Sequence, residues 1–517
     1  MKATAGGGTD QVNRREAIKG IAGSGSIVSG AVWNGTALAA ADQAVASDIV
    51  RFGADIEPLV RLIEQTPRRQ CIEVVAGRLK AGLSYRELLS ALFLAGIRNV
   101  SPQPPGFKFH CVFVLHSANQ LSLDAPDRER LLPLLWALDY FKQSQQRDAD
   151  EGDFQLRSPK GPLPSASNAW GEFHAAMQSW DEERADRAIT ALARTKGGHE
   201  VIEGLWRYGA RDYRNIGHKA IFTASAWRTL QAIGWRHAEP ALRSLVLGLL
   251  DFGTDRRMNG YTFEDQSHAA NAETASKVLP KLPPDWISGK STDPSRARGV
   301  LEAVRGAAPI AASGEVAKML VEGQVNARDA WDGIHLAAGE LMLRLPGILG
   351  VHCVTSANAL HYAFRMSGDA ETRLYLLLQG VGWMGQFAKY MSHDRKMRDL
   401  DLSKLERADE SPSGSEAVTA IFGQLDTDID DAARRAFAYA KDQPDLTEFF
   451  RSSLNILFRK VDESHRFKYA AAIFEDLALV SPAWRPHMLA TSTYYLHGPS
   501  DRDSAAVMRA REALGVS

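Results

Sequence analysis

Histidines followed by small residues are the side chains of this sequence best suited to chemistry. The stretches GFKFHCVFVLHSANQL and ILGVHCVTSANALHYAF each contain His-Cys-Val, and Ser-Ala-Asn follows closely in both. Neutral imidazole is a common ligand of iron, copper, zinc and nickel. The chain has only 14 histidines. Their recurrence in apolar surroundings leaves two interpretations, a buried metal site or histidines that only fill the core.

Four segments supply candidate metal ligands, and each opens an apolar helical stretch. They contain His110 or His116, His218, His352 and His465. Because His110 and His116 are six positions apart, about 240° around an ideal helix, they cannot both point at one centre without a bend. His335 also opens an apolar stretch and competes with His352, whereas His361 should point away. The sequence does not decide which member of each pair faces the site.

The segment HRFKYAAAIF adds a lysine to the candidate site. His465 and Lys468 are three positions apart, which makes them neighbours on one face of a helix that we expect to be buried. A buried lysine is costly unless it is paired or neutral. It can pair with an acid, or react with CO2 to give a carbamate whose oxygens bind a metal. Several histidines with at most one oxygen ligand suit non-haem iron, with copper or zinc as alternatives.

Other chemistries find little support in the sequence. The chain contains no GxxxxGK[ST] or HExxH motif, and no GxGxxG between a strand and a helix. Its 61 basic and 62 acidic residues give no excess of positive charge for a nucleic-acid partner. Its 3 cysteines cannot form a disulfide framework, and we expect Cys111 and Cys353 to be small core residues. No residue is singled out as catalytic.

Apolar residues at three-to-four spacing predict an all-α fold. The pattern begins near residue 48 and continues almost to the end, with Ser84 and Asp127 as predicted helix N-caps. We expect one large domain of layered helix pairs over residues 48–517, with possible subdivision near 285–300 and 405–415. A loose repeat, in which His116, His218 and His352 each precede small residues and a second helix, lacks a fixed period. The small residues would let helices approach closely around a common centre.

The N-terminus resembles a twin-arginine export signal. Arg14 and Arg15 stand before the weakly apolar run IAGSGSIVSGAVW, and small residues near Ala39 to Ala41 suit cleavage. The run is too short and too rich in Gly and Ser to span a bilayer. We therefore expect residues 1–41 to be a signal peptide, the Tat export machinery to be a partner, and the mature protein to be periplasmic or secreted, without a membrane span.

At these motifs the sequence resembles the questin oxidase-like family. The matching segments are HCVTSANAL at residues 352–360, HRFK at residues 465–468, and single histidines that open earlier apolar helices, as His110 or His116 and His218 do. The resemblance implies an all-α fold and oxidation of polycyclic quinones, including Baeyer–Villiger-type or ring-cleaving reactions. In some members it also implies a non-haem iron held by histidines and a carboxylated lysine.

These observations converge on an exported, metal-dependent oxidoreductase that uses dioxygen on a small organic, aromatic or quinone-like substrate. The expected ligands of a mononuclear iron are His116 or His110, His218, His352 and His465, and Lys468 serves as a carbamate ligand or as a nearby charge. Two alternatives stay open. One is a periplasmic helical-repeat binding or scaffold protein in which the histidines are structural, and the other is a zinc-dependent hydrolase.

Overall fold

The described part of the chain is built almost entirely from helices. A computed structural model describes residues 48–127, 129–252, 265–290, 293–394, 396–408, 412 and 414–516. Within these ranges no strand is present, and extended pairing is limited to an isolated antiparallel bridge between Ile49 and Arg157. The predicted all-α class is therefore confirmed. The predicted signal peptide, residues 1–41, lies outside the described residues.

The helices follow one another with short connections. The helices of the first half are α2 Glu57–Gln65, α3 Arg68–Lys80, α4 Tyr85–Asn99, α5 His110–Leu123, α6 Leu132–Glu151, α7 Ala169–Ser179, α8 Glu182–Thr195, α9 Gly198–Gly209, α10 His218–Ile233, α11 Ala238–Leu249 and α12 Gln266–Val278. Those of the second half are α13 Pro294–Gly306, α14 Pro309–Val321, α15 Ala327–Arg344, α16 Ile348–Met366, α17 Ala370–Asp394, α18 Gly414–Gln424, α19 Ile429–Asp442, α20 Thr447–Lys460, α21 Ser464–Leu479, α22 Arg485–Ser492 and α23 Ala505–Leu514.

Local sequence determines where several of these helices begin. The Ser84 hydroxyl accepts a hydrogen bond from the backbone N–H of Glu87, whose carboxylate accepts one from the backbone N–H of Ser84. This reciprocal capping box confirms the predicted start of α4. The predicted cap at Asp127 is wrong, because α6 begins further on, at Leu132, with Pro133 in its first turn. Proline suits that position because a first-turn residue has no intrahelical partner for its N–H.

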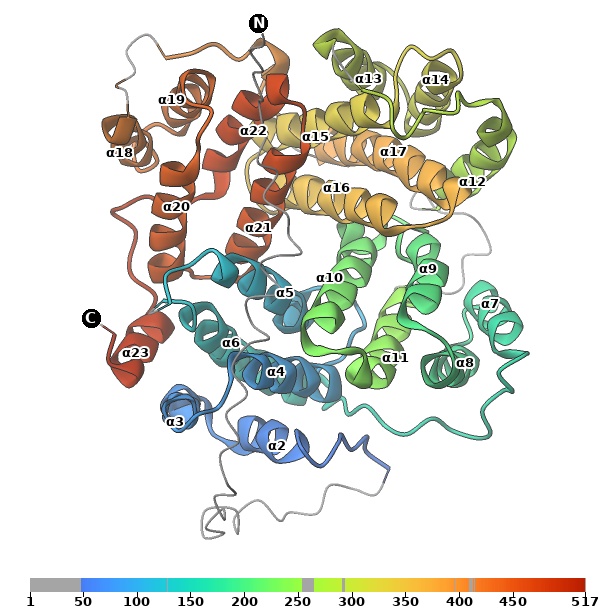
Figure 1. Ribbon diagram of the computed structural model, residues 1–517, viewed down its shortest axis with the longest axis vertical. Coiled ribbons are helices and arrows are strands. Elements are labelled where there is room, and N and C mark those ends of the chain that lie inside the picture. The colour runs from blue at the N-terminus through green and yellow to red at the C-terminus, as the bar shows by residue number, and fades with distance from the viewer. Residues whose placement is uncertain are drawn as a thin grey trace, which may run out of the picture. The chain divides into compact units, whose positions relative to one another are not determined.

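Four helices form the centre of the domain. Helix α5 packs against α10 and α21, and α16 packs against the same two helices, so the four close into a ring. In Figure 1 they surround the middle of the view, although they come from distant parts of the chain. Small residues on their facing sides, such as Ala224 and Ala471, permit this close packing. The ring is the scaffold on which the predicted ligands converge.

The other helices cover this ring in layers. Helices α4 and α6 pack on α5, α9 and α11 on α10, α15 and α17 on α16, and α22 on α21. By its contacts, the chain from Ala46 to Ser517 forms one unit. The histidine-bearing ends of the central helices are therefore shielded from solvent by a further shell of helices. Such a shell lowers the local dielectric around any charge at the centre.

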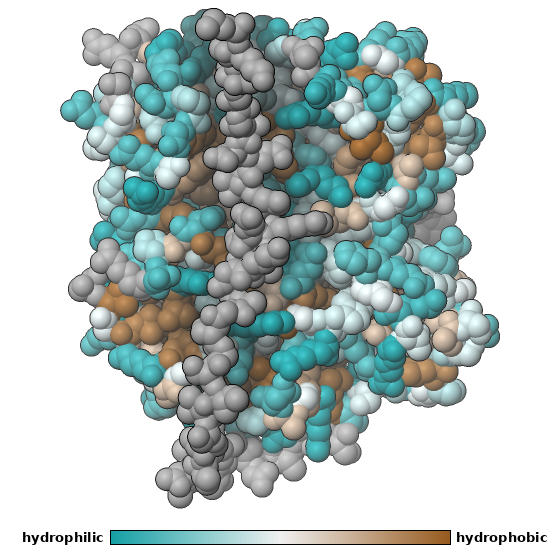
Figure 2. All heavy atoms as spheres, in the orientation of Figure 1, coloured by the Kyte–Doolittle hydropathy of each residue, from teal (hydrophilic) through white to brown (hydrophobic). Residues whose placement is uncertain are grey.

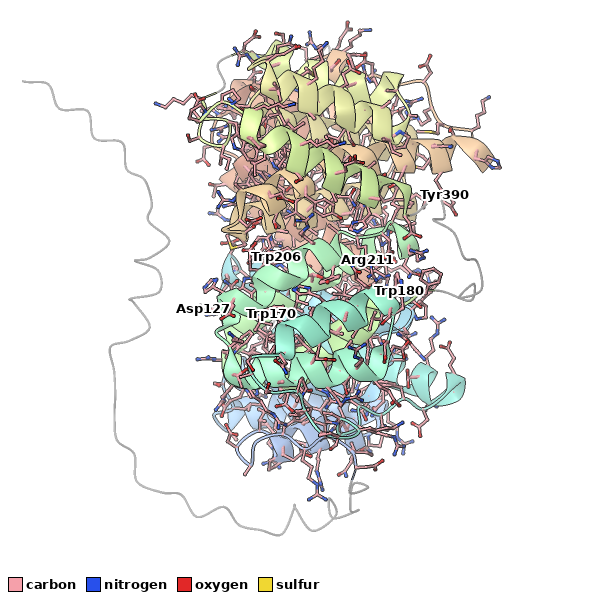
Figure 3. All side chains as sticks on the ribbon, turned by 90° about the vertical axis from the view of Figure 1, so that its right-hand side faces the viewer. Asp127, Trp170, Trp180, Trp206, Arg211 and Tyr390 are labelled. Atoms are coloured by element: carbon pink, nitrogen blue, oxygen red, sulfur yellow. The ribbon has the colours of Figure 1, made fainter. Side chains whose placement is uncertain are left out.

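Large aromatic side chains act as packing anchors between the layers. Trp206, Trp331 and Trp383 are among the largest fully buried side chains. In Figure 3, Trp180 lies beside Arg211, whose guanidinium carbon is 3.7 Å from the centre of the indole ring, a cation–π contact. On the face shown in Figure 2 hydrophilic residues predominate, with a larger hydrophobic area at the lower left, where α6 and α23 lie in Figure 1.

Candidate metal centre

Four histidines, one from each central helix, converge in the interior. One ring nitrogen from each of His110, His218, His352 and His465 lies within 4.8 Å of the corresponding atoms of the other three. The four residues are 5, 5, 0 and 8 % exposed, respectively. Two of them are the first residue of their helix, one is the second and one the fifth. Four helix N-termini therefore face one point, where their partial positive charges favour an anion.

A strained turn aims His218 at this point. Asn215, Ile216 and Gly217 have φ values of 54, 50 and 85°, three successive residues in the left-handed region. An isoleucine rarely adopts this conformation, so the surrounding packing must hold it. The turn brings the Asn215 carbonyl oxygen to 2.5 Å from His218 Nδ1. Local strain is thus spent on the orientation of one imidazole.

Hydrogen bonds fix the tautomers of three of the rings. His352 Nδ1 lies 2.6 Å from the Ile348 carbonyl oxygen, and His465 Nδ1 lies 2.9 Å from a carboxylate oxygen of Glu463. Carbonyl and carboxylate oxygens only accept, so Nδ1 carries the hydrogen in these two rings and in His218. Their Nε2 atoms then present lone pairs to the centre. This arrangement, with the outer nitrogen bound to an oxygen, is typical of metal-ligating histidines.

The inner nitrogens lie too close together for neutral rings alone. His218 Nε2 is 2.9 Å from His352 Nε2 and 2.8 Å from His110 Nε2. Two bare lone pairs at this distance repel unless a cation lies between them. Nitrogens bound about 2.05 Å from one ion would be about 2.9 Å apart at right angles and about 3.3 Å apart in a tetrahedron. The donor set therefore fits a single metal ion with ligands at right angles.

The pKa values of the four rings favour the neutral form that binds metal. Burial, followed by the nearby charge of Lys468, lowers the pKa of His110 and of His218 well below the usual value. Burial and then the neighbouring His218 do the same for the pKa of His352. Burial also lowers the pKa of His465. A proton is therefore a poor substitute for the cation that the geometry requires.

Lys468 lies against this group without a hydrogen-bond partner. Its Nζ is buried and unpaired among the described residues, 5.7 Å from the centre of the Phe113 ring. Burial lowers the pKa of Lys468 to about 7, so a substantial share of the amine is neutral at physiological pH. This environment fits either role expected from the sequence, a carbamate ligand or a nearby charge. The ligand group itself consists of the four imidazoles.

Two further candidate histidines lie elsewhere. His116, six positions after His110, is outside the group, and its Nε2 is 3.0 Å from an Arg228 guanidinium nitrogen. His335, the competitor of His352, faces away and its Nε2 lies 2.8 Å from Nδ1 of His361. In each pair of candidates the helical repeat allows one residue to face the centre. Cys111 and Cys353 are buried free thiols, as expected of core residues.

Sequence reasoning missed three residues that support the site. Glu463 accepts the hydrogen bond from His465, and Tyr495 also donates to it. Burial opposes ionisation of Glu463, but these two bonds lower its pKa. Arg228 and Glu475 form an ion pair across α10 and α21 with a nitrogen–oxygen distance of 2.5 Å. The available signal is their spacing, since each stands ten positions after a ligand histidine.

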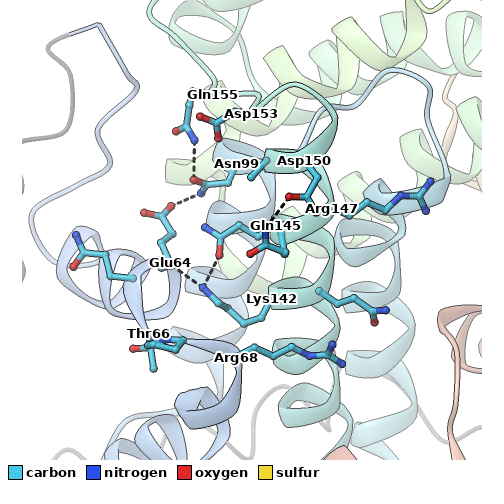
Figure 4. Close-up of a pocket in the computed structure, with 15 residues that line it drawn as sticks. Glu64, Thr66, Arg68, Asn99, Lys142, Gln145, Arg147, Asp150, Asp153 and Gln155 are labelled. Atoms are coloured by element: carbon cyan, nitrogen blue, oxygen red, sulfur yellow. Dashed lines mark hydrogen bonds between the residues drawn. The ribbon is translucent and has the colours of Figure 1, made fainter.

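The two largest surface pockets lie apart from this group. The first, of about 650 Å³, is an open polar hollow between α2, α4 and α6, and none of the four histidines lines it (Figure 4). Its buried Lys142 donates to the carbonyl oxygens of Ile63 and Glu64, so it stabilises the end of α2. The second, of about 590 Å³, lies beside α23 and is lined by Trp136 and Tyr140. Neither hollow shows an unpartnered buried group that points to a ligand.

Comparisons with known proteins leave the chain without a relative. No family model, curated protein or solved structure matches the sequence. Among the described residues, no helix combines the length and the apolar character needed to cross a bilayer. The function proposed below therefore rests on the geometry of the site and on the sequence motifs.

Proposed function

We propose that the protein is a metal-dependent oxidoreductase with one ion bound by His110, His218, His352 and His465. The observation that carries the proposal is the 2.9 Å separation of two Nε2 atoms, on His218 and His352, whose rings both donate through Nδ1 to carbonyl oxygens. Neutral rings in these tautomers cannot hydrogen-bond to each other. A cation between them removes the repulsion and uses both lone pairs.

Non-haem iron is the metal that we infer for this site. An all-nitrogen set at right angles leaves positions open on the ion, which suits iron or copper, whereas structural and catalytic zinc favours a tetrahedron. When bound, such an ion supplies redox chemistry with dioxygen for an organic substrate. The protein contributes the orientation of the rings, a site without water, and Lys468 as a carbamate ligand or a movable proton. Export through the twin-arginine route remains a prediction from residues 1–41.

Metal analysis of purified protein tests this proposal. We expect about one iron per chain in protein expressed in iron-replete medium, with an iron signal in electron paramagnetic resonance. His352→Ala should lose most of the metal. His393→Ala is the control, because that residue is exposed near the end of α17, outside the group. Stoichiometric zinc without iron or copper would support the hydrolase alternative, and absence of all three metals would leave the scaffold alternative.

A further inference from the structure

A small chamber lies directly behind the four histidines. Its volume is about 30 Å³, and every residue that lines it stands three, six, seven or ten positions after one of the four. The residues at three positions are Phe113, Ile221, Thr355 and Lys468. In an α-helix, positions three, seven and ten further on lie on the same face, each turn further along the axis. The four helices therefore run in one direction away from the site, and the chamber lies on their common axis.

The size of the chamber limits what can occupy it. About 30 Å³ holds roughly two waters or one molecule of two or three heavy atoms. Alanines at positions six and seven, including Ala224, Ala359 and Ala471, create this space where larger side chains would fill it. An aromatic substrate cannot enter here. Any such substrate has to approach the ion from another side.

One buried polar group points to a ligand in the chamber. Lys468 lines it with an Nζ that has no hydrogen-bond partner among the described residues, and the residue is 3 % exposed. The neighbouring hydroxyls of Ser225 and Thr355 donate to carbonyl oxygens of their own helices. Lys468 is therefore the lining group with unused hydrogen-bonding capacity, and burial makes an unused amine costly. A small polarisable or anionic molecule would satisfy it.

The far end of the chamber is closed by a polar layer. Arg228 and Glu475 pair at 2.5 Å, and the Arg228 guanidinium carbon lies 3.7 Å from the centre of the Tyr362 ring. All three stand ten positions after a ligand histidine. The side chains of the pair are each 10 % exposed, so this layer touches solvent while the chamber behind it is enclosed. A side-chain movement of Arg228 would open the axis.

We propose that the chamber binds a ligand of two or three heavy atoms, of the class that includes dioxygen, nitric oxide and azide. The ligand enters past the Arg228–Glu475 pair, contacts Lys468, and meets the ion on the side away from the organic substrate. This inference rests on the proposed metal centre. It assigns to residues of α10, α16 and α21 a role in selecting ligand size and in controlling entry.

Rapid-mixing measurements with nitric oxide and azide on iron-loaded protein test the route. Ala224→Val fills the chamber, and Ala226→Val on the same helix is the matched control, because Ala226 is buried but does not line it. We expect iron content to stay unchanged in both and the association rate to fall about tenfold or more in Ala224→Val alone. Glu475→Gln weakens the closing pair and should raise the rate several-fold. Equal rates in Ala224→Val and the unaltered protein would overturn the route.

A second measurement does not need the metal. Crystals of metal-free protein under xenon pressure should show xenon in the chamber, and Ala224→Val crystals should not. An empty chamber in the unaltered protein would overturn the inference. Failure of the unaltered protein to bind iron, with xenon in the chamber, would refute the metal centre and leave the chamber as a gas-binding cavity. The two proposals can thus fail separately.

Discussion

Gly106 provides a sharp test of the metal centre, because the chain contains a matched control for it. Gly106 has φ 123° and ψ −161°, and Gly347 has φ 122° and ψ −162°. Each precedes a ligand histidine by four or five positions. A Cβ on Gly106 would lie 3.0 Å from Cε1, 3.1 Å from Nδ1 and 3.3 Å from Nε2 of His218. A Cβ on Gly347 would meet nothing within 4 Å.

The magnitude follows from these contacts. Alanine at either position has the same backbone strain, roughly 1–2 kcal/mol, and this cost cancels in the comparison. Ordinary contact begins near ~3.5 Å, so the His218 ring must retreat by roughly 0.5 Å in Gly106→Ala. That is about the tolerance of a functional site. We expect metal affinity to fall about 10–100-fold, as when an outer-shell partner is removed, whereas Gly347→Ala should keep it.

Competition with a chromophoric chelator measures both affinities, and urea unfolding of the metal-free proteins measures the shared strain. Two results would refute the reasoning. Equal metal affinities in Gly106→Ala and Gly347→Ala would mean that the His218 ring does not bind the ion. A much larger loss of metal-free stability in Gly106→Ala than in Gly347→Ala would mean that the close contact disturbs folding and not only the ring.

Three further predictions concern stability. Burial, and then the charges of Lys441 and Arg298, lowers the pKa of His487 from 6.5 to about 4. Between these values the unfolded chain binds more protons, so the stability contributed by the neutral ring is complete above pH 6.5 and is lost towards pH 4, by about 3 kcal/mol. His487→Gln should reduce this pH dependence of the unfolding free energy, and an unchanged slope would contradict it. Arg98→Met should cost about 3–5 kcal/mol in urea unfolding, because it leaves two carboxylates near a 1 % exposed position without their cation; a loss below 1 kcal/mol would contradict the role of Arg98. Chelation should lower the melting temperature by about 3 °C relative to protein with metal at roughly 100 times its Kd, since about 2.7 kcal/mol is spread over roughly 470 residues, and no shift would speak against a bound ion.

The sequence predicted the helices and the identity of the converging segments better than the choice within them. Apolar periodicity identifies buried faces, and small residues after each histidine indicate close helix packing. It could not choose between His110 and His116, because the answer depends on where α5 begins. That start is set by η1 (Phe107–Phe109) and the left-handed residue before it. The same limit explains the error at Asp127.

The partners of the site could not be predicted for a different reason. Arg228 and Glu475 are 247 positions apart, and either residue alone resembles a solvated charge on a helix. Their pairing appears only when the helices are set parallel, with the histidines as a common origin. Glu463 is likewise an ordinary acid in sequence, and its role follows from the turn that places it beside His465 Nδ1.

The charge balance of the site leads to a last prediction, on Glu463. Four neutral imidazoles bring no charge, and four helix N-termini add partial positive charge. Among the described residues, the carboxylate hydrogen-bonded to a ligand ring is that of Glu463. A divalent ion in this setting keeps excess positive charge and should attract an anion, which the chamber beside Lys468 can admit.

Glu463→Gln keeps a hydrogen-bond acceptor for His465 but removes the negative charge. It should therefore weaken metal binding about 10–100-fold and strengthen azide binding to the ion that remains bound, because less charge is neutralised by the protein. Isothermal titration with the metal and optical titration with azide give the two affinities. Tyr495→Phe, which removes a hydrogen bond to Glu463 and leaves its charge, is the control. Opposite changes in the two affinities would identify charge as the cause, whereas a parallel fall in both would mean that the substitution only displaces His465.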